Sequence, residues 1–177
     1  IIKSDKILRA VARELNLTTA YYLPGRIMNS EQWKNCPVKI EWLSTDYNML
    51  DEKSLSLNLT ITKKGFKIEE LGNKELVFNK RYVINNIPFK ITSTTKQLKQ
   101  FYNKKYLIQK STLSGVVSQL IGSINASVLS DDSDVVVLSN KGLNQEKSKD
   151  IINCLIKVYN EDGIKDRQLA FKNTIEF

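Results

Sequence analysis

The C-terminal segment constrains the fold most, because residues 144–177 read as one long helix without an end signal. This segment contains no proline and a single glycine, Gly163. Ile151, Leu155 and Val158 recur at the i, i+4 and i+7 spacing of an amphipathic helix. A helix of about 34 residues would rise roughly 50 Å. No capping glycine or stop proline follows, so we expect the helix to be cut in mid-run and the chain to be part of a larger protein.

The rest of the sequence alternates between helix-like and strand-like patterns. Helices are predicted over residues 6–16, after the cap Ser4-Asp5, and over residues 112–121. Period-two alternation predicts strands at 38–42, 55–61, 66–70, 82–84, 89–92, 106–109, 124–129 and 135–138. A turn is expected at 21–25, a short helical piece at 30–34 and another turn at 130–133.

This order predicts an α+β fold in one domain over residues 1–177, with a mixed or antiparallel sheet packed against helices. We expect a basic, β-rich insertion at about residues 44–104 and the long helix at about residues 144–177. The longest apolar runs have only the length of a strand, and no membrane span or signal peptide is found.

The net charge of +8 is concentrated in the middle of the chain. Residues 61–110 hold twelve lysines and arginines against Glu69, Glu70 and Glu75. Such a segment is typical of a solvated face, but it would also suit nucleic acid, anionic lipid or an acidic polysaccharide. The dominance of lysine over arginine and the lack of a nucleic-acid-binding motif disfavour nucleic acid.

No constellation of residues suited to catalysis, cofactor binding or metal binding is found, so no site residues are assigned and no enzyme activity is expected. The chain has no histidine, the commonest general base and metal ligand. Residues 131–134 resemble half of a calcium loop but lack its glycine and closing glutamate, which favours a plain turn. Glu69 and Glu70, as neighbours on a strand, would point to opposite faces. Cys36 and Cys154 are interpreted as two buried thiols, with a disulfide between them as the alternative.

Three blocks of sequence, in order, resemble a known family. The first is residues 4–17, SDKILRAVARELNL; the second is residues 111–124, STLSGVVSQLIGSI. The third joins the strand at 135–139 to the long helix, with SKDIINCLIKVY at 148–159 and RQLAFKNTIEF at 167–177. Together they resemble the polysaccharide co-polymerases: the chain-length determinant (Wzz-like) proteins and the bacterial tyrosine autokinases that share their periplasmic domain. The larger middle region is similar to the autokinase branch, although no Walker motif or tyrosine-rich tail is present.

The resemblance implies a domain on the periplasmic face of the bacterial inner membrane, held by two membrane spans outside this sequence. It implies assembly into a homo-oligomer that controls the length or export of capsular or exopolysaccharide. The implied partners are further copies of the chain, a polysaccharide polymerase, an outer-membrane export protein and the polysaccharide itself, but no nucleic acid. The implied role is non-catalytic and needs no cofactor.

Two other functions are compatible with the residues. A secreted or surface carbohydrate-binding or adhesion module would use Trp33, Trp42 and the tyrosines to stack on sugars, although these aromatic residues also suit a core. Nucleic-acid binding through residues 61–110 would show strong dependence on salt.

Overall fold

The structure, a computed structural model, describes residues 2–44, 46–129 and 135–175. It confirms the predicted α+β class: the described residues form four α-helices and three antiparallel sheets. The chain divides into two compact units. We call Ile1–Leu17 together with Leu113–Phe177 the helical unit, and Thr18–Thr112 the β unit.

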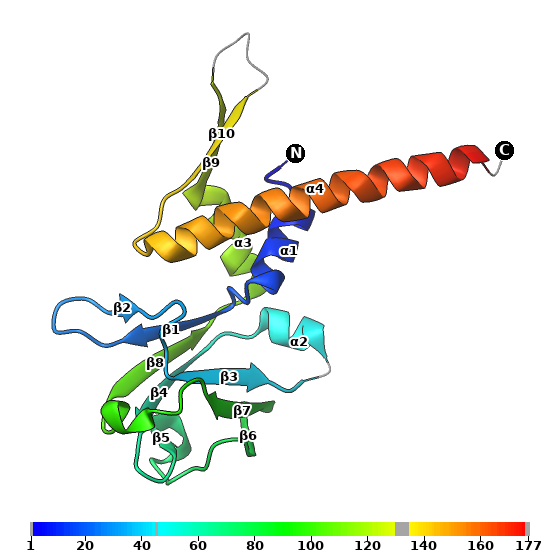
Figure 1. The fold of residues 1–177 in the computed structure, drawn as a ribbon. Coiled ribbons are helices and arrows are strands. Elements are labelled where there is room, and N and C mark those ends of the chain that lie inside the picture. The colour runs from blue at the N-terminus through cyan, green and yellow to red at the C-terminus, as the bar shows by residue number, and fades with distance from the viewer. Residues whose placement is uncertain (1, 45, 130–134, 176–177) are drawn as a thin grey trace. The chain divides into compact units, whose positions relative to one another are not determined.

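The helical unit is built on three helices and a hairpin (Figure 1). Helix α1 (Asp5–Glu14) begins after Ser4, whose hydroxyl accepts a hydrogen bond from the Ile7 N–H at 3.5 Å. It contacts both α3 (Leu113–Ser123) and α4 (Gln145–Ile175). Strands β9 (Ile124–Val128) and β10 (Val136–Asn140) form the hairpin between α3 and α4. The core of the unit comes from the apolar stripe of each helix: Ile7, Leu8, Val11, Ala12, Leu113, Val116, Val117, Leu120, Ile151, Cys154, Leu155 and Val158.

The β unit contains two antiparallel sheets. Five strands form the first sheet in the order β2-β1-β8-β4-β5, and three form the second in the order β3-β7-β6. The strands of the first sheet are β1 (Thr19–Leu23), β2 (Ser30–Glu31), β4 (Leu55–Ile61), β5 (Phe66–Ile68) and β8 (Lys105–Lys110). Those of the second are β3 (Val38–Trp42), β6 (Arg81–Ile84) and β7 (Ile87–Ser93). Short helical segments complete the unit: α2 (Tyr47–Glu52) and the 3₁₀ turns η1 (Glu69–Leu71) and η2 (Leu98–Phe101).

One hydrophobic core joins the two sheets. Alternate residues of β4 point into it, and Leu57, Leu59 and Ile61 are fully buried. The second sheet contributes Ile40 and Phe89 to the same core. Two polar contacts also link the sheets: the Tyr21 hydroxyl accepts from the Ile40 N–H at 3.1 Å, and the Trp42 indole N–H donates to the Thr19 hydroxyl at 3.0 Å.

Several sequence-based expectations for this unit were wrong. The turn expected at 21–25 lies largely in β1, which pairs with β8, and the helical piece expected at 30–34 begins as the short strand β2. Glu69 and Glu70 lie in η1 rather than on a strand. Helix α2 was not predicted, and the turn expected at 130–133 lies outside the described residues. The β unit extends over Thr18–Thr112, with β1 paired with β8 and β3 paired with β7.

A buried lysine fixes the end of α2 in the β unit. Lys110 is only 4% exposed, and its ammonium group donates hydrogen bonds to the carbonyl oxygens of Leu50 and Lys53, the latter at 3.0 Å. These carbonyls lie at the end of α2, where helical N–H groups run out, although the Lys53 N–H also donates to the Leu50 carbonyl at 3.4 Å. Burial lowers the pKa of Lys110, and the nearby Asp51 carboxylate opposes that shift.

We expect Lys110→Met to lower the free energy of unfolding by about 1–3 kcal/mol, because two carbonyl oxygens lose their buried donor. Urea unfolding measures the change. Lys105→Met is the matched control, since Lys105 lies on the same strand with an exposed side chain and pairs with Glu69 at the surface. Equal losses in both variants would contradict the capping role.

Gly65 follows the tight turn between β4 and β5, where the Thr62 N–H donates to the Gly65 carbonyl at 2.9 Å. A Cβ atom at this position would overlap the Leu76 carbonyl oxygen, so we expect Gly65→Ala to destabilise the β unit by about 1–3 kcal/mol.

Gly163→Ala should have the opposite effect and stabilise the chain by up to about 1 kcal/mol, because the space around Gly163 in α4 is open and alanine favours a helix. Urea unfolding of both variants tests the pair, and destabilisation of similar size at both positions would refute it.

Candidate functional site

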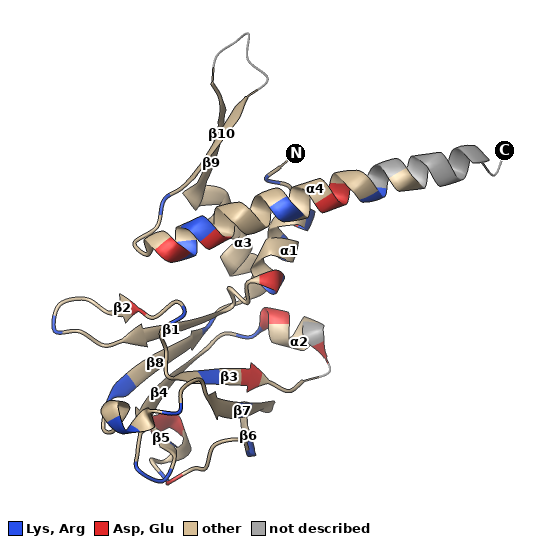
Figure 2. Cartoon of the chain, viewed as in Figure 1, with Lys and Arg blue, Asp and Glu red and all other residues tan. Residues whose placement is uncertain are grey.

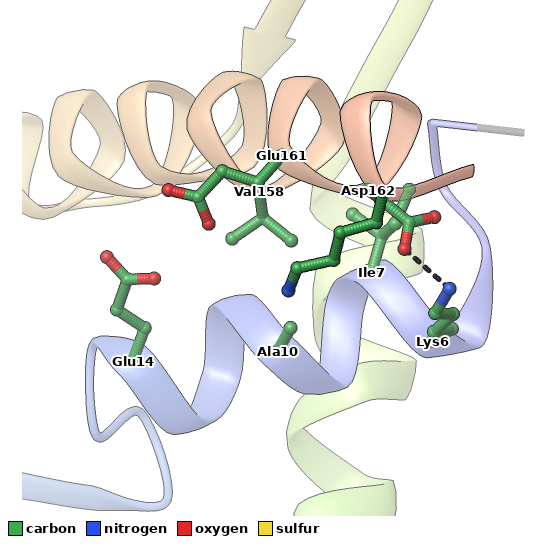
Figure 3. Close-up of a pocket in the computed structure, with 8 residues that line it drawn as sticks. Lys6, Ile7, Ala10, Glu14, Val158, Glu161 and Asp162 are labelled. Carbon is green, nitrogen blue, oxygen red and sulfur yellow. Dashed lines mark ion pairs between the residues drawn. The ribbon is translucent and has the colours of Figure 1, made fainter. Parts of the chain in front are cut away.

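A small groove between α1 and α4 in the helical unit is the first place to look for chemistry. Its volume is about 180 Å³, and charged side chains of both helices line much of it (Figure 3). The apolar lining residues are Ile7, Ala10 and Val158. The charged ones are Lys6, Glu14, Glu161, Asp162 and Lys165.

The carboxylates of this groove are engaged in ion pairs. Lys6 pairs with Asp162 at 2.5 Å. Lys157 lies 2.7 Å from Glu14 and 3.9 Å from Glu161, and its hydrogen bond with Glu14 raises the pKa of Lys157. A general acid or base must exchange its proton near neutral pH, whereas the raised pKa of Lys157 keeps that group charged. The groove therefore serves the packing of two helices better than it would serve a reaction.

The described residues offer no metal centre. Their cysteines, aspartates and glutamates form no group of three that could hold a metal ion. Glu69 pairs with Lys105 at 3.2 Å, while Glu70 accepts hydrogen bonds from the backbone N–H and side-chain amide of Asn58. The half calcium loop at 131–134 lies outside the described residues.

Both cysteines are free and buried, so the structure contains no Cys36–Cys154 disulfide. Cys36 belongs to the core of the β unit and Cys154 to that of the helical unit. Burial raises the pKa of each thiol from 9.0 to about 11. The reactive thiolate is therefore strongly disfavoured near neutral pH, and neither residue has the character of a nucleophile.

The tryptophans give limited support to a sugar-stacking surface. The Trp42 ring is half-buried against the core of the β unit, 6.1 Å from the ring of Phe89, and its N–H is bound to Thr19. Trp33 is also half-buried and makes contacts of its own. The contacts of Trp42 with Phe89 and Thr19 thus account for this residue as a link between the two sheets, without a bound sugar.

The hairpin of the helical unit is the most unusual surface in the described chain. Figure 1 shows β9 and β10 extending from the end of α3. Large apolar side chains on the hairpin are exposed: Val128 by 58%, Leu129 by 66%, Val135 by 54%, Val136 by 55% and Val137 by 43%. Neighbouring residues of a strand point to opposite faces, so Val136 and Val137 expose apolar surface on both faces. We call these five residues the valine hairpin.

The valine hairpin has the properties of a protein interaction surface. Each of its two strands has an edge that no other described strand covers. Unpaired edges can accept a further strand, and contiguous exposed apolar surface marks contact sites between proteins. An isolated two-stranded hairpin is also marginally stable in water, so a partner would stabilise it. Sequence analysis predicted the two strands, but the apolar run at 135–138 reads equally well as a buried strand.

Neither the protein-family models nor the curated proteins compared with this sequence give a match. Within the described residues, no helix combines the length and the apolar character needed to cross a bilayer.

The buried thiol of Cys36 predicts a loss of stability at alkaline pH. In the unfolded chain this thiol ionises near its ordinary pKa of 9.0, whereas in the folded chain it does so near 11. As the pH rises through this window, the unfolded state loses the proton first and gains stability relative to the folded state. We expect the free energy of unfolding to fall between pH 9 and about 11.

Urea unfolding at a series of pH values measures this effect, and Cys36→Ala should show a shallower fall than the wild type. Part of the slope should remain in the variant, because burial also raises the pKa of the Cys154 thiol from 9.0 to about 11 and that of the Tyr21 hydroxyl from 10.0 to about 12. Identical slopes for the wild type and Cys36→Ala would rule out a contribution from the thiol.

Proposed function

We propose that this chain is the non-catalytic periplasmic domain of an inner-membrane polysaccharide co-polymerase. Such a domain would regulate the chain length or export of capsular or exopolysaccharide through oligomeric assembly. The valine hairpin is the observation that carries the proposal, because a surface of this kind is suited to contacts between subunits. The full-length protein would face the periplasm and act with a polymerase and an outer-membrane export protein.

The order of elements in the helical unit supports the same proposal. The three blocks that resemble the co-polymerases fall on α1, on α3 and on the segment from β10 through α4. These elements form one compact unit although the β unit lies between the first two blocks in sequence. The blocks therefore coincide with the parts of one packed structure.

The length of α4 also supports a role in assembly. Its 31 residues correspond to about 47 Å, whereas the 10 residues of α1 correspond to about 15 Å. Figure 1 shows α4 running well beyond the region where it crosses α1. The exposed side chains of Ile156, Tyr159 and Ile164 leave apolar surface on this helix for another subunit.

The proposal is tested in the full-length membrane protein with the double variant V128K/V136K. Val128 and Val136 face each other across the hairpin, so two lysines there place like charges side by side in the proposed subunit contact. We expect chemical cross-linking in membranes to yield smaller oligomers, and gel electrophoresis of the polysaccharide to show an altered length distribution.

The matched control is I27K/M28K, which introduces the same charges at two exposed apolar positions of the β unit. It should leave the oligomer size and the polysaccharide length unchanged. A V128K/V136K protein that is folded, forms wild-type oligomers and gives wild-type polysaccharide would refute the proposal. So would a complete reading frame without apolar segments of about 20 residues on either side of this domain.

A further inference from the structure

The whole excess of positive charge belongs to the β unit. Residues 18–112 contain sixteen lysines and arginines and eight aspartates and glutamates, an excess of eight. The helical unit contains eleven of each and is formally neutral. One unit of the chain therefore attracts anions at long range, whereas the other does not.

Within the β unit, four lysines gather at one end of the first sheet. Lys63 and Lys64 form the turn between β4 and β5, while Lys99 lies in η2 and Lys104 directly precedes β8. Backbone hydrogen bonds hold these segments together: Asn103 N–H donates to the Ile61 carbonyl at 2.8 Å, and Ile61 N–H donates to the Lys104 carbonyl at 3.2 Å. Figure 2 shows positively charged residues in this part of the unit, near the labels β4, β5 and β8. We call these four residues the lysine end.

The carboxylates near the lysine end are already engaged. Glu69 pairs with Lys105 at 3.2 Å. Glu75 accepts a hydrogen bond from the Thr62 hydroxyl and lies 4.0 Å from Lys67. Glu69 and Glu75 are thus paired with Lys105 and Lys67. No carboxylate among the described residues forms an ion pair with Lys63, Lys64, Lys99 or Lys104. Their charge is available to a ligand.

The surroundings of the lysine end indicate the class of ligand. Among the large, exposed apolar side chains of the described residues, Val77 lies beside Gly65 at this end, and none lies within residues 62–65 or 96–104. One half-exposed valine is a small apolar surface compared with the apolar face by which an amphipathic segment enters a bilayer. It contains no arginine for base recognition, and Phe101 and Tyr102 pack against the core instead of forming a stacking platform. The Lys104 ammonium lies 5.2 Å from the centroid of the Phe101 ring, which further commits that ring to the protein.

We propose that the lysine end binds a linear polysaccharide that carries carboxylate groups. This inference rests on the proposed function and adds to it the chemical class of the polymer. Lysine ammonium groups act as hydrated point charges, which suits repeated carboxylates on a flexible chain without a fixed bidentate geometry. Binding of this kind is electrostatic and weakens as salt screens the charges.

The 177-residue chain and polygalacturonate as a probe provide the test, with titration calorimetry at low salt as the measurement. We expect the wild type to bind polygalacturonate, to lose this binding at high salt and to ignore neutral dextran. The variant K63Q/K64Q/K99Q/K104Q should bind about tenfold more weakly or worse, because it loses four charges that face the polymer. Circular dichroism establishes that the variant is folded.

The matched control is K39Q/K53Q/K74Q/K80Q, which removes the same number of exposed charges from other parts of the β unit. It should retain most of the affinity, and a loss equal to that of the first variant would overturn the lysine end as the site. Absence of binding to polygalacturonate at low salt would also overturn it. Equal or tighter binding of single-stranded DNA, or of vesicles containing phosphatidylglycerol, through the same four lysines would overturn the choice of polysaccharide. The assembly experiment with V128K/V136K is independent of this one, so failure here leaves the proposed function standing.

Discussion

The packing of α1 against α4 is the interaction on which the helical unit depends. Leu8 and Val11 of α1 and Leu155 of α4 are completely buried in its core. The two helices come from opposite ends of the chain, and the ion pair between Glu14 and Lys157 joins residues 143 positions apart. Closing so large a loop costs conformational entropy, but this cost grows only slowly with loop length. The apolar stripes of the helices can therefore offset it, and the intervening β unit folds around a core of its own.

Sequence patterns correctly predicted the helices and strands in which apolar residues recur at regular spacing and are buried. The alternating apolar positions of β4 lie in the core as expected, and so do the spaced apolar positions of α1, α3 and α4. The errors fall where long-range contacts decide the local structure. Residues 19–23 carry two tyrosines before a proline and a glycine, and only pairing with β8 makes them a strand. At the end of helix α2, the Lys110 side chain of β8 donates hydrogen bonds to backbone carbonyls. The sequence of residues 47–52 alone does not predict this long-range contact.

The candidate surfaces were predictable to different degrees. The excess of lysine at 61–110 is visible in the sequence, but the structure is needed to separate Lys67 and Lys105, which face glutamates, from the four residues of the lysine end. The valine hairpin was harder to foresee. A run of valines is typical of a strand buried on both faces. Its exposure becomes evident only in the structure, where β9 and β10 pair with each other and with no further strand of the described residues.

The two surfaces differ in physical character, and this difference argues for a division of tasks. Apolar association through the valine hairpin would persist at high salt, because burial of apolar surface does not depend on charge. Attraction of an anion to the lysine end is long-ranged and is weakened by salt. A scaffold of the proposed kind would need a durable contact between subunits and a reversible contact with the charged polymer. In this chain the apolar hairpin belongs to the neutral unit and the lysines to the basic one, so the subunit contact and the polymer contact would not compete for the same surface.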